Sequence, residues 1–175
     1  MQKGLIHVYY GYGKGKTTAA LGLALRASGS GKKVVIVQFL KESNTSELNN
    51  LRLLPNITVL RGTAGKAFVR DMTPEQLEKT KHLQDANLKK ALDIVSSGGC
   101  DLLILDEALD AYQLGLLDCA LFLDLVTNKP EALELAITGH KPVDAIISRA
   151  DYVTEMVKIK HPYDNGIKAR KGVEF

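Results

Sequence analysis

A glycine-rich stretch close to the N-terminus constrains the fold of this chain more than any other feature. It lies between a short apolar run and a segment rich in Ala and Leu, and it consists of Gly11, Tyr12, Gly13, Lys14, Gly15, Lys16, Thr17 and Thr18. A strand, a glycine-rich turn and a Gly-Lys-Thr that opens a helix are typical of the phosphate-binding loop, or Walker A motif. Glycines let successive backbone N–H groups point into one concave nest, and the helix N-terminus adds unpaired donors. The sequence therefore predicts that residues 11–18 bind the phosphates of a nucleotide.

Two side chains of this loop have predicted roles of their own. Lys16 is expected to reach the outer phosphates, and the hydroxyl of Thr17 is expected to bind Mg²⁺. The loop is one residue shorter than the common form, because Tyr10 stands where the first glycine usually lies and the nearest glycine is Gly11. The alternative is a turn that binds no ligand, but the strand before the Gly-Lys-Thr and the helix after it argue against that alternative.

A pair of acidic residues follows an apolar run in the middle of the chain. Residues 102–105 are all Leu or Ile, as is typical of a strand buried on both faces, and Asp106 and Glu107 come next. Carboxylates at the tip of such a strand would hold Mg²⁺ opposite Thr17, directly or through water. The alternative is that the two acids cap a helix. Beside a phosphate-binding loop, we favour the metal site.

Apolar runs alternate with helix-like segments along the chain. Strands are expected at residues 5–10, 34–39, 57–60, 102–105, 135–138 and 152–159, and helices at 16–28, 74–95, 118–127 and 142–149. Thr73 and Gln76 form a capping box around Pro74, which suits the first position of the longest helix. Strands that are apolar throughout and separated by helices indicate a mostly parallel sheet with helices on both faces. We therefore predict a single α/β domain over residues 1–175.

Charge and composition exclude several classes of protein. The chain has 23 Lys and Arg against 20 Asp and Glu, and a net charge of +3 is too small to predict nucleic-acid binding. No apolar run reaches the ~18 residues of a membrane span, and the first residues lack the apolar stretch of a secretory signal. We interpret Cys100 and Cys119 as buried thiols, because they have no metal-ligand spacing. A cytoplasmic protein with no membrane partner is expected.

The loop and the acidic strand tip indicate ATP or GTP with Mg²⁺, but they do not specify a reaction. The stretch at Asn128, Lys129 and Pro130 lacks the Asp of a guanine-binding NKxD motif, so ATP is favoured. A small-molecule kinase or nucleotidase, and a non-catalytic ATP-binding accessory module, stay open as alternatives on these residues.

Five segments resemble one known family, the P-loop ATP:corrinoid adenosyltransferases. They are GYGKGKTTAALGLALRA, VVIVQFLK, LLILDEALDAYQLGLL, LAITGHKP and ADYVTEMVKIKHPYDNGIKARKGVEF, in the same order as in the family. Generic P-loop proteins share only the GKGKTT loop of the first segment and the LDE of the third. The resemblance implies a RecA-like P-loop fold, usually in a homodimer.

The resemblance also implies a reaction. Members of this family act in cobalamin biosynthesis and salvage, and they transfer the 5′-deoxyadenosyl group of ATP to the Co(I) of a reduced corrinoid with release of triphosphate. The implied partners are ATP, Mg²⁺ or Mn²⁺, a reduced corrinoid and an electron donor such as a flavoprotein. The nucleophile is the cobalt of the substrate, so no nucleophilic side chain is required.

Residue roles follow from the resemblance, position by position. Lys14 and Lys16 would stabilise the triphosphate, and Phe68 would press against the corrin face to remove the lower axial ligand of cobalt. Four further residues would line the cofactor site, namely Gln38, Lys41, Glu155 and His161. Two positions differ from related enzymes, because Arg70 stands where a Trp is common and His140 stands where an Arg is common.

Overall fold

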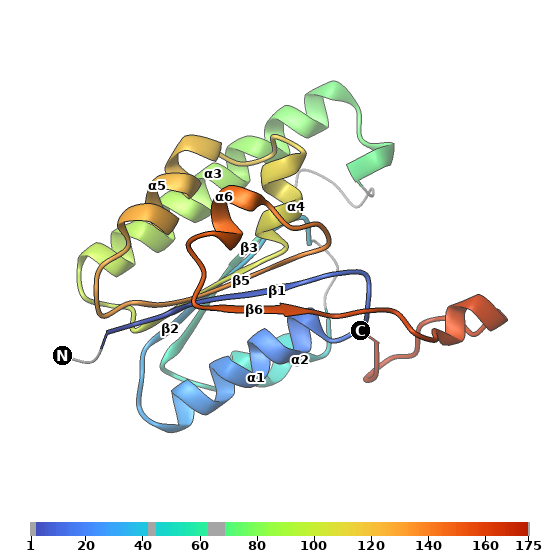
Figure 1. Cartoon of the computed structure of the whole chain (residues 1–175), viewed down its shortest axis with the longest axis horizontal. Helices are drawn as coiled ribbons and strands as arrows, with labels where there is room; N and C mark the ends of the chain where they lie inside the picture. The colour runs from blue at the N-terminus through green and yellow to red at the C-terminus, as the bar shows by residue number, and fades with distance from the viewer. Residues whose placement is uncertain (1–2, 42–44, 63–68, 175) are drawn as a thin grey trace.

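A parallel sheet lies at the centre of the fold (Figure 1). The computed structural model describes residues 3–41, 45–62 and 69–174, and these residues form six strands. In chain order the strands are β1 (Ile6–Tyr10), β2 (Val34–Gln38), β3 (Ile57–Arg61), β4 (Leu102–Asp106), β5 (Glu134–Gly139) and β6 (Tyr152–Glu155). Their spatial order is β3-β2-β4-β5-β1-β6, and every neighbouring pair is parallel. The carboxyl ends of the strands therefore lie at one edge of the sheet.

Helices cover both faces of this sheet, as Figure 1 shows. One face carries α1 (Lys16–Gly29) and α2 (Glu47–Leu51), and the other carries α3 (Pro74–Ser96), α4 (Ala108–Gln113), α5 (Cys119–Asn128) and α6 (Asp144–Ile147). The described residues also form two short 3₁₀ helices, Val69–Asp71 and Pro162–Asn165. The predicted α/β class, with a parallel sheet between two helical layers, is confirmed.

The side chains of the central strands alternate between two hydrophobic clusters. On β2, Val35 and Val37 belong to the cluster beneath α3 and α5, whereas Val34 and Ile36 pack with α1 and α2. The residues of β4 alternate in the same way. All five positions of each strand are buried, which explains why their sequences are almost uninterrupted apolar runs. Burial of each aliphatic side chain contributes roughly 1.5–3 kcal/mol, and it fixes the positions of the polar residues at the strand tips.

The predicted capping box is present at the start of α3. The hydroxyl of Thr73 accepts a hydrogen bond from the backbone N–H of Gln76 at 3.3 Å, and the Gln76 side-chain oxygen accepts one from the Thr73 backbone N–H at 2.9 Å. Pro74 occupies the first helical position. The two reciprocal bonds satisfy donors that a helix N-terminus otherwise leaves unpaired.

Replacing Thr73 with alanine is expected to lower the free energy of unfolding by about 1 kcal/mol, because one of these two bonds is lost. Urea denaturation followed by circular dichroism measures the change. Thr73→Ser keeps the hydroxyl and should retain most of the stability. Equal destabilisation by both substitutions would show that the cap does not supply the effect.

Some local features differ from the sequence-based expectation. The last strand ends at Glu155 rather than at residue 159, because the chain leaves the sheet at Met156 to contact the phosphate-binding loop. The short helices α2 and α4 were not predicted. Cys100 is buried as expected, and burial raises the pKa of its thiol to about 12, but Cys119 is only partly buried. In the described part of the chain, no helix has the length and apolar character needed to cross a membrane.

Candidate nucleotide and metal site

The phosphate-binding loop connects β1 to α1 at the carboxyl edge of the sheet. Gly15 has a φ of 118°, in the left-handed region that favours glycine, and α1 begins at the next residue, Lys16. Because glycine has no side chain that could cap the helix, the first N–H groups of α1 can bind an anion such as phosphate.

The segment after β6 supports the loop from one side. The Gly13 N–H donates a hydrogen bond to the Met156 carbonyl at 2.6 Å, and the Met156 N–H donates to the Tyr10 carbonyl at 2.7 Å. A Cβ atom on Gly11 or Gly13 would lie 2.5 or 2.6 Å from the Met156 carbonyl oxygen. Close backbone approach, in addition to phosphate binding, therefore requires glycine at both positions.

Lys16 is folded over this loop. Its ammonium group donates a hydrogen bond to the Gly13 carbonyl at 3.0 Å. Burial lowers the pKa of Lys16, although the carboxylates of Asp110, Glu107 and Asp106 act in the opposite direction. The side chain is thus held at the loop with acidic residues nearby, within the region where the sequence predicts the triphosphate.

Asp106 lies at the tip of β4, fully buried, and its carboxylate binds the loop. Its Oδ1 atom accepts hydrogen bonds from the Thr17 hydroxyl at 2.9 Å and from the Thr138 hydroxyl at 2.7 Å. The Thr138 hydroxyl in turn accepts a hydrogen bond from the Glu107 backbone N–H at 2.9 Å. The parallel register brings β4 and β5 side by side, so these contacts join α1, β4 and β5 at the carboxyl edge.

The last residue of β2 and Lys41, three residues after it, contribute two further side chains to the same carboxylate. The Lys41 ammonium donates to Asp106 Oδ2 at 2.6 Å and to the Thr17 hydroxyl at 3.0 Å, and it lies 3.4 Å from Glu107 Oε1. The Gln38 amide nitrogen donates to Asp106 Oδ2 at 3.3 Å. Residues predicted separately from the second strand and from the acidic pair therefore meet in one cluster.

The charges in this cluster influence one another. Burial opposes the charge on Lys41, but the carboxylates of Asp106 and Glu107 outweigh it, so the pKa of Lys41 is raised. Burial also raises the pKa of Glu107, and the neighbouring Lys41 ammonium offsets part of that increase. Glu107 adopts a left-handed φ of 61°, a conformation that a non-glycine residue rarely takes outside a functional or capping position.

This arrangement fits a Mg²⁺ ion. Mg²⁺ prefers oxygen ligands, and in nucleotide sites it binds one or two carboxylates together with phosphate oxygens of the substrate. The Thr17 hydroxyl and the carboxylates of Asp106 and Glu107 supply such oxygens, and the Lys41 ammonium contacts all three side chains. These residues can therefore hold the metal of a metal–nucleotide complex.

Comparison with known proteins decides the family. A family model described as ATP:corrinoid adenosyltransferase BtuR/CobO/CobP matches residues 2–175. The chain belongs to this family. The adenosyltransferase assignment agrees with the phosphate-binding loop and the buried strand-tip carboxylate, and the function and enzyme class predicted from the sequence are confirmed.

Individual relatives support the same assignment over nearly the full length. Corrinoid adenosyltransferases from Pseudomonas aeruginosa and Escherichia coli K12 are 34% and 32% identical to the chain, cover 99% of it, and are themselves covered over 85% and 87% of their lengths. The corrinoid adenosyltransferase CobA of Salmonella typhimurium is 30% identical, with 99% and 87% covered. These names favour an adenosyltransferase over the kinase, nucleotidase and accessory-module alternatives.

A solved structure supports the fold. The KaiC-like protein PH0186 from Pyrococcus horikoshii superposes with a TM-score of 0.56 at 15% identity, covering 99% of this chain and 77% of its own. At this identity the likeness concerns the fold alone, and it agrees with the predicted RecA-like α/β architecture.

Other residues predicted for the adenosyltransferase site lie outside this cluster. Lys14 is exposed and forms an ion pair with Glu174 at 3.1 Å, and Thr18 is exposed at the start of α1. Tyr12 is also exposed, with its ring centroid 5.5 Å from that of His140. These side chains are therefore exposed and do not belong to the buried Asp106 cluster.

The C-terminal segment carries two more of the predicted site residues. Glu155 is exposed at the end of β6. The pKa of Tyr10 is raised mainly by desolvation of its hydroxyl, and the nearby Glu155 carboxylate raises it further. His161 caps a 3₁₀ helix, because its Nδ1 atom accepts a hydrogen bond from the Tyr163 N–H at 3.2 Å. Phe68 lies outside the described residues.

Sequence reasoning did not single out two polar residues near the Asp106 cluster. Thr138 was assigned only to a strand, although its hydroxyl binds Asp106 and positions Glu107. Asp110 accepts hydrogen bonds from the backbone N–H and from the Nδ1 atom of His140, each at 3.0 Å. Its negative charge also opposes the lowering of the Lys16 pKa by burial. The signal that could have identified Thr138 is its place as the polar residue that ends the apolar run Leu135–Ile137, next to the strand tip.

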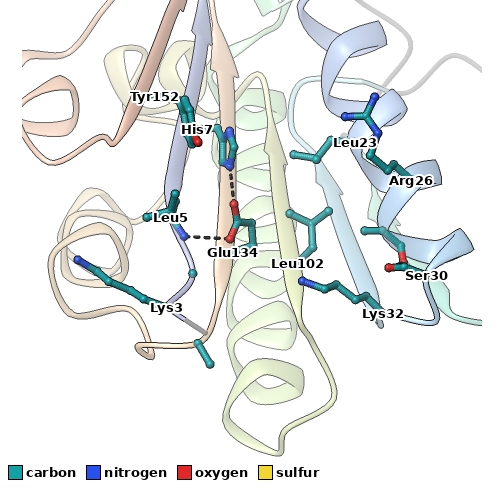
Figure 2. Close-up of a pocket in the computed structure, with 13 residues that line it drawn as sticks. Lys3, Leu5, His7, Leu23, Arg26, Ser30, Lys32, Leu102, Glu134 and Tyr152 are labelled. Carbon is teal, nitrogen blue, oxygen red and sulfur yellow. Dashed lines mark hydrogen bonds and ion pairs between the residues drawn. The ribbon is translucent and has the colours of Figure 1, made fainter. Parts of the chain in front are cut away.

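Figure 2 shows a pocket at the amino-terminal ends of the strands, where Leu102, Glu134 and Tyr152 each begin a strand. It has a volume of about 400 Å³. His7 Nε2 lies 2.5 Å from Glu134 Oε1, the rings of His7 and Tyr152 stack with centroids 4.6 Å apart, and Glu134 Oε2 accepts a hydrogen bond from the Leu5 N–H. These contacts join β1, β5 and β6, and we interpret His7 as structural.

Proposed function

We propose that this adenosyltransferase attaches the 5′-deoxyadenosyl group of ATP to the Co(I) of a reduced corrinoid by means of the cluster around Asp106. The observation that carries this proposal is the contact between the Thr17 hydroxyl of the phosphate-binding loop and the fully buried carboxylate of Asp106, in a chain that matches the family from residue 2 to residue 175. This contact supports the proposal because it brings a residue of the predicted triphosphate loop next to a predicted metal ligand.

The reaction needs positioning and charge stabilisation from the protein. The electron pair of Co(I) in the substrate forms a bond to the 5′ carbon of ATP, the bond from that carbon to the 5′ oxygen breaks, and its electrons leave with the triphosphate. Lys16, Lys14 and the loop N–H groups would stabilise the negative charge that grows on the leaving group. Mg²⁺ held by Thr17, Asp106 and Glu107 would supply further positive charge to the phosphate oxygens.

The remaining predictions complete the proposal. Gln38 and Lys41 would line the nucleotide site, supported by their contacts with Asp106, whereas the roles of Glu155, His161 and Phe68 are supported by the resemblance of their motifs. Residues 1–175 would form one nucleotide-binding domain that acts in the cytoplasm as a homodimer. A flavoprotein or a similar donor would supply the electrons that form Co(I).

Product analysis tests this function. Incubation with ATP, Mg²⁺ and chemically reduced cob(I)alamin is expected to give the adenosylated corrinoid, seen in its absorption spectrum, and one triphosphate for each corrinoid converted. The control omits the corrinoid and should release no triphosphate. Release of ADP and phosphate without a cobalt–carbon bond would instead favour a kinase or nucleotidase, and tight ATP binding without products would favour an accessory module.

A further inference from the structure

The ammonium group of Lys41 lies where the proposed Mg²⁺ ligands converge. The Lys41 Nζ atom lies 2.6 Å from Asp106 Oδ2, 3.0 Å from the Thr17 hydroxyl oxygen and 3.4 Å from Glu107 Oε1. It therefore contacts every side chain that is predicted to hold the metal. We propose that Lys41 is a built-in cation that fills the metal position while the nucleotide is absent and leaves it when the metal–nucleotide complex enters. This inference rests on the proposed nucleotide site.

The direction of the hydrogen bonds supports competition between the ammonium and a metal. The Thr17 hydroxyl donates its proton to Asp106 Oδ1, so its lone pairs are left to accept the hydrogen bond from Lys41. A metal would need a lone pair of the same hydroxyl oxygen. Mg²⁺ binds oxygen at about 2.0–2.1 Å, and a second cation on the same three oxygens would be strongly repelled.

Burial explains why the Asp106 carboxylate needs a cationic partner when no metal is bound. The Asp106 side chain is fully buried and that of Lys41 is 18% exposed. A buried carboxylate without a partner is strongly destabilising, because its charge has lost its hydration. Lys41 compensates this charge, and Gln38 and Thr138 provide neutral hydrogen bonds to the same carboxylate.

The same contacts couple metal binding to nucleotide binding. A free metal ion has to displace a tethered ammonium and gains no phosphate ligand in return. A metal that arrives with triphosphate brings its own phosphate ligands and gives the displaced ammonium an anionic partner. The long flexible stem of lysine allows this movement of the charged group without a change in the backbone. Lys41 therefore makes the site select the metal–nucleotide complex over the free metal.

Binding of Mn²⁺ without nucleotide tests the inference. Electron paramagnetic resonance of free Mn²⁺ gives the dissociation constant for the unaltered chain, for Lys41→Met and for Lys79→Met. Lys79 is a matched control, because its ammonium pairs with the Glu75 carboxylate at 2.7 Å on the exposed surface of α3. Lys41→Met is expected to bind Mn²⁺ about tenfold or more tightly than the unaltered chain, and Lys79→Met should match the unaltered chain.

Further variants separate the possible outcomes. Lys41→Arg keeps a cation and should keep the weak Mn²⁺ binding, and adding Asp106→Asn to Lys41→Met should remove the gain. Lys41→Gln repeats the test should Lys41→Met lose its native circular dichroism spectrum. Equal Mn²⁺ affinity of the unaltered chain and the folded neutral variants would overturn the inference. Failure of the unaltered chain to bind Mn²⁺ even with ATP present would count against the proposed function instead.

Discussion

Replacing Lys16 with alanine is expected to lower kcat/KM for corrinoid adenosylation by about a thousandfold. The ammonium of Lys16 is held against the Gly13 carbonyl within the phosphate-binding loop, close to the predicted position of the departing triphosphate. Charge on that leaving group grows as the carbon–oxygen bond breaks, so removal of a nearby cation acts on the transition state more than on binding of ATP. Initial rates of adenosylcobalamin formation from pre-reduced cob(I)alamin measure the loss.

A second lysine serves as the control for this experiment. Lys158 is exposed, and its ammonium pairs with Asp164 at 3.0 Å, so Lys158→Ala removes a cation of the same type outside the Asp106 cluster. This variant should keep its activity within about twofold, since exposed ion pairs contribute little. A Lys16→Ala enzyme with nearly unchanged kcat/KM would contradict the assigned role in triphosphate stabilisation.

Replacing Asp106 with alanine is expected to lower the free energy of unfolding by about 3 kcal/mol and to abolish detectable turnover. The substitution removes the acceptor for hydrogen bonds from Thr17, Thr138, Gln38 and Lys41, and it leaves the largely buried Lys41 ammonium without its closest anion. Turnover is lost because the same carboxylate is the proposed metal ligand. Urea denaturation measures the first effect, and formation of adenosylcobalamin measures the second.

A double substitution distinguishes loss of the ion pair from loss of volume. Adding Lys41→Met to Asp106→Ala removes the uncompensated cation, so the double variant should recover at least about 1 kcal/mol relative to simple addition of the two single effects. Additive effects would mean that Lys41 and Asp106 do not stabilise each other. Recovery of stability without recovery of turnover would agree with separate structural and metal-binding roles of Asp106.

The sheet and the long helices were predictable because they depend on local patterns. The apolar runs of β2 and β4 fill both faces of the sheet, and the Thr73 capping box marks the start of α3 without reference to the rest of the chain. Helices α2 and α4 have five and six residues, too few for a helical period to stand out. Their existence depends on packing against the sheet, which no short segment encodes.

The candidate site was predictable in its parts but not in its connections. Each of Thr17, Asp106 and Lys41 follows from a motif, and the parallel order of strands brings their elements to one edge. The Lys41 ammonium contacts both Thr17 and Asp106, and the Thr138 hydroxyl binds Asp106. These contacts depend on how side chains from β2, β4 and β5 pack together. Sequence spacing carries no information about these contacts.

The hydrogen bond between Gly13 and Met156 has a consequence for the order of events during synthesis. The ribosome makes residues 11–18 early, but β6 and the Met156 that follows it, which supports the loop, emerge only after the other strands. A nascent chain can therefore form its glycine-rich turn without yet giving that turn its final shape. ATP capture should begin late, when β6 has docked beside β1, which would keep incomplete chains from sequestering nucleotide.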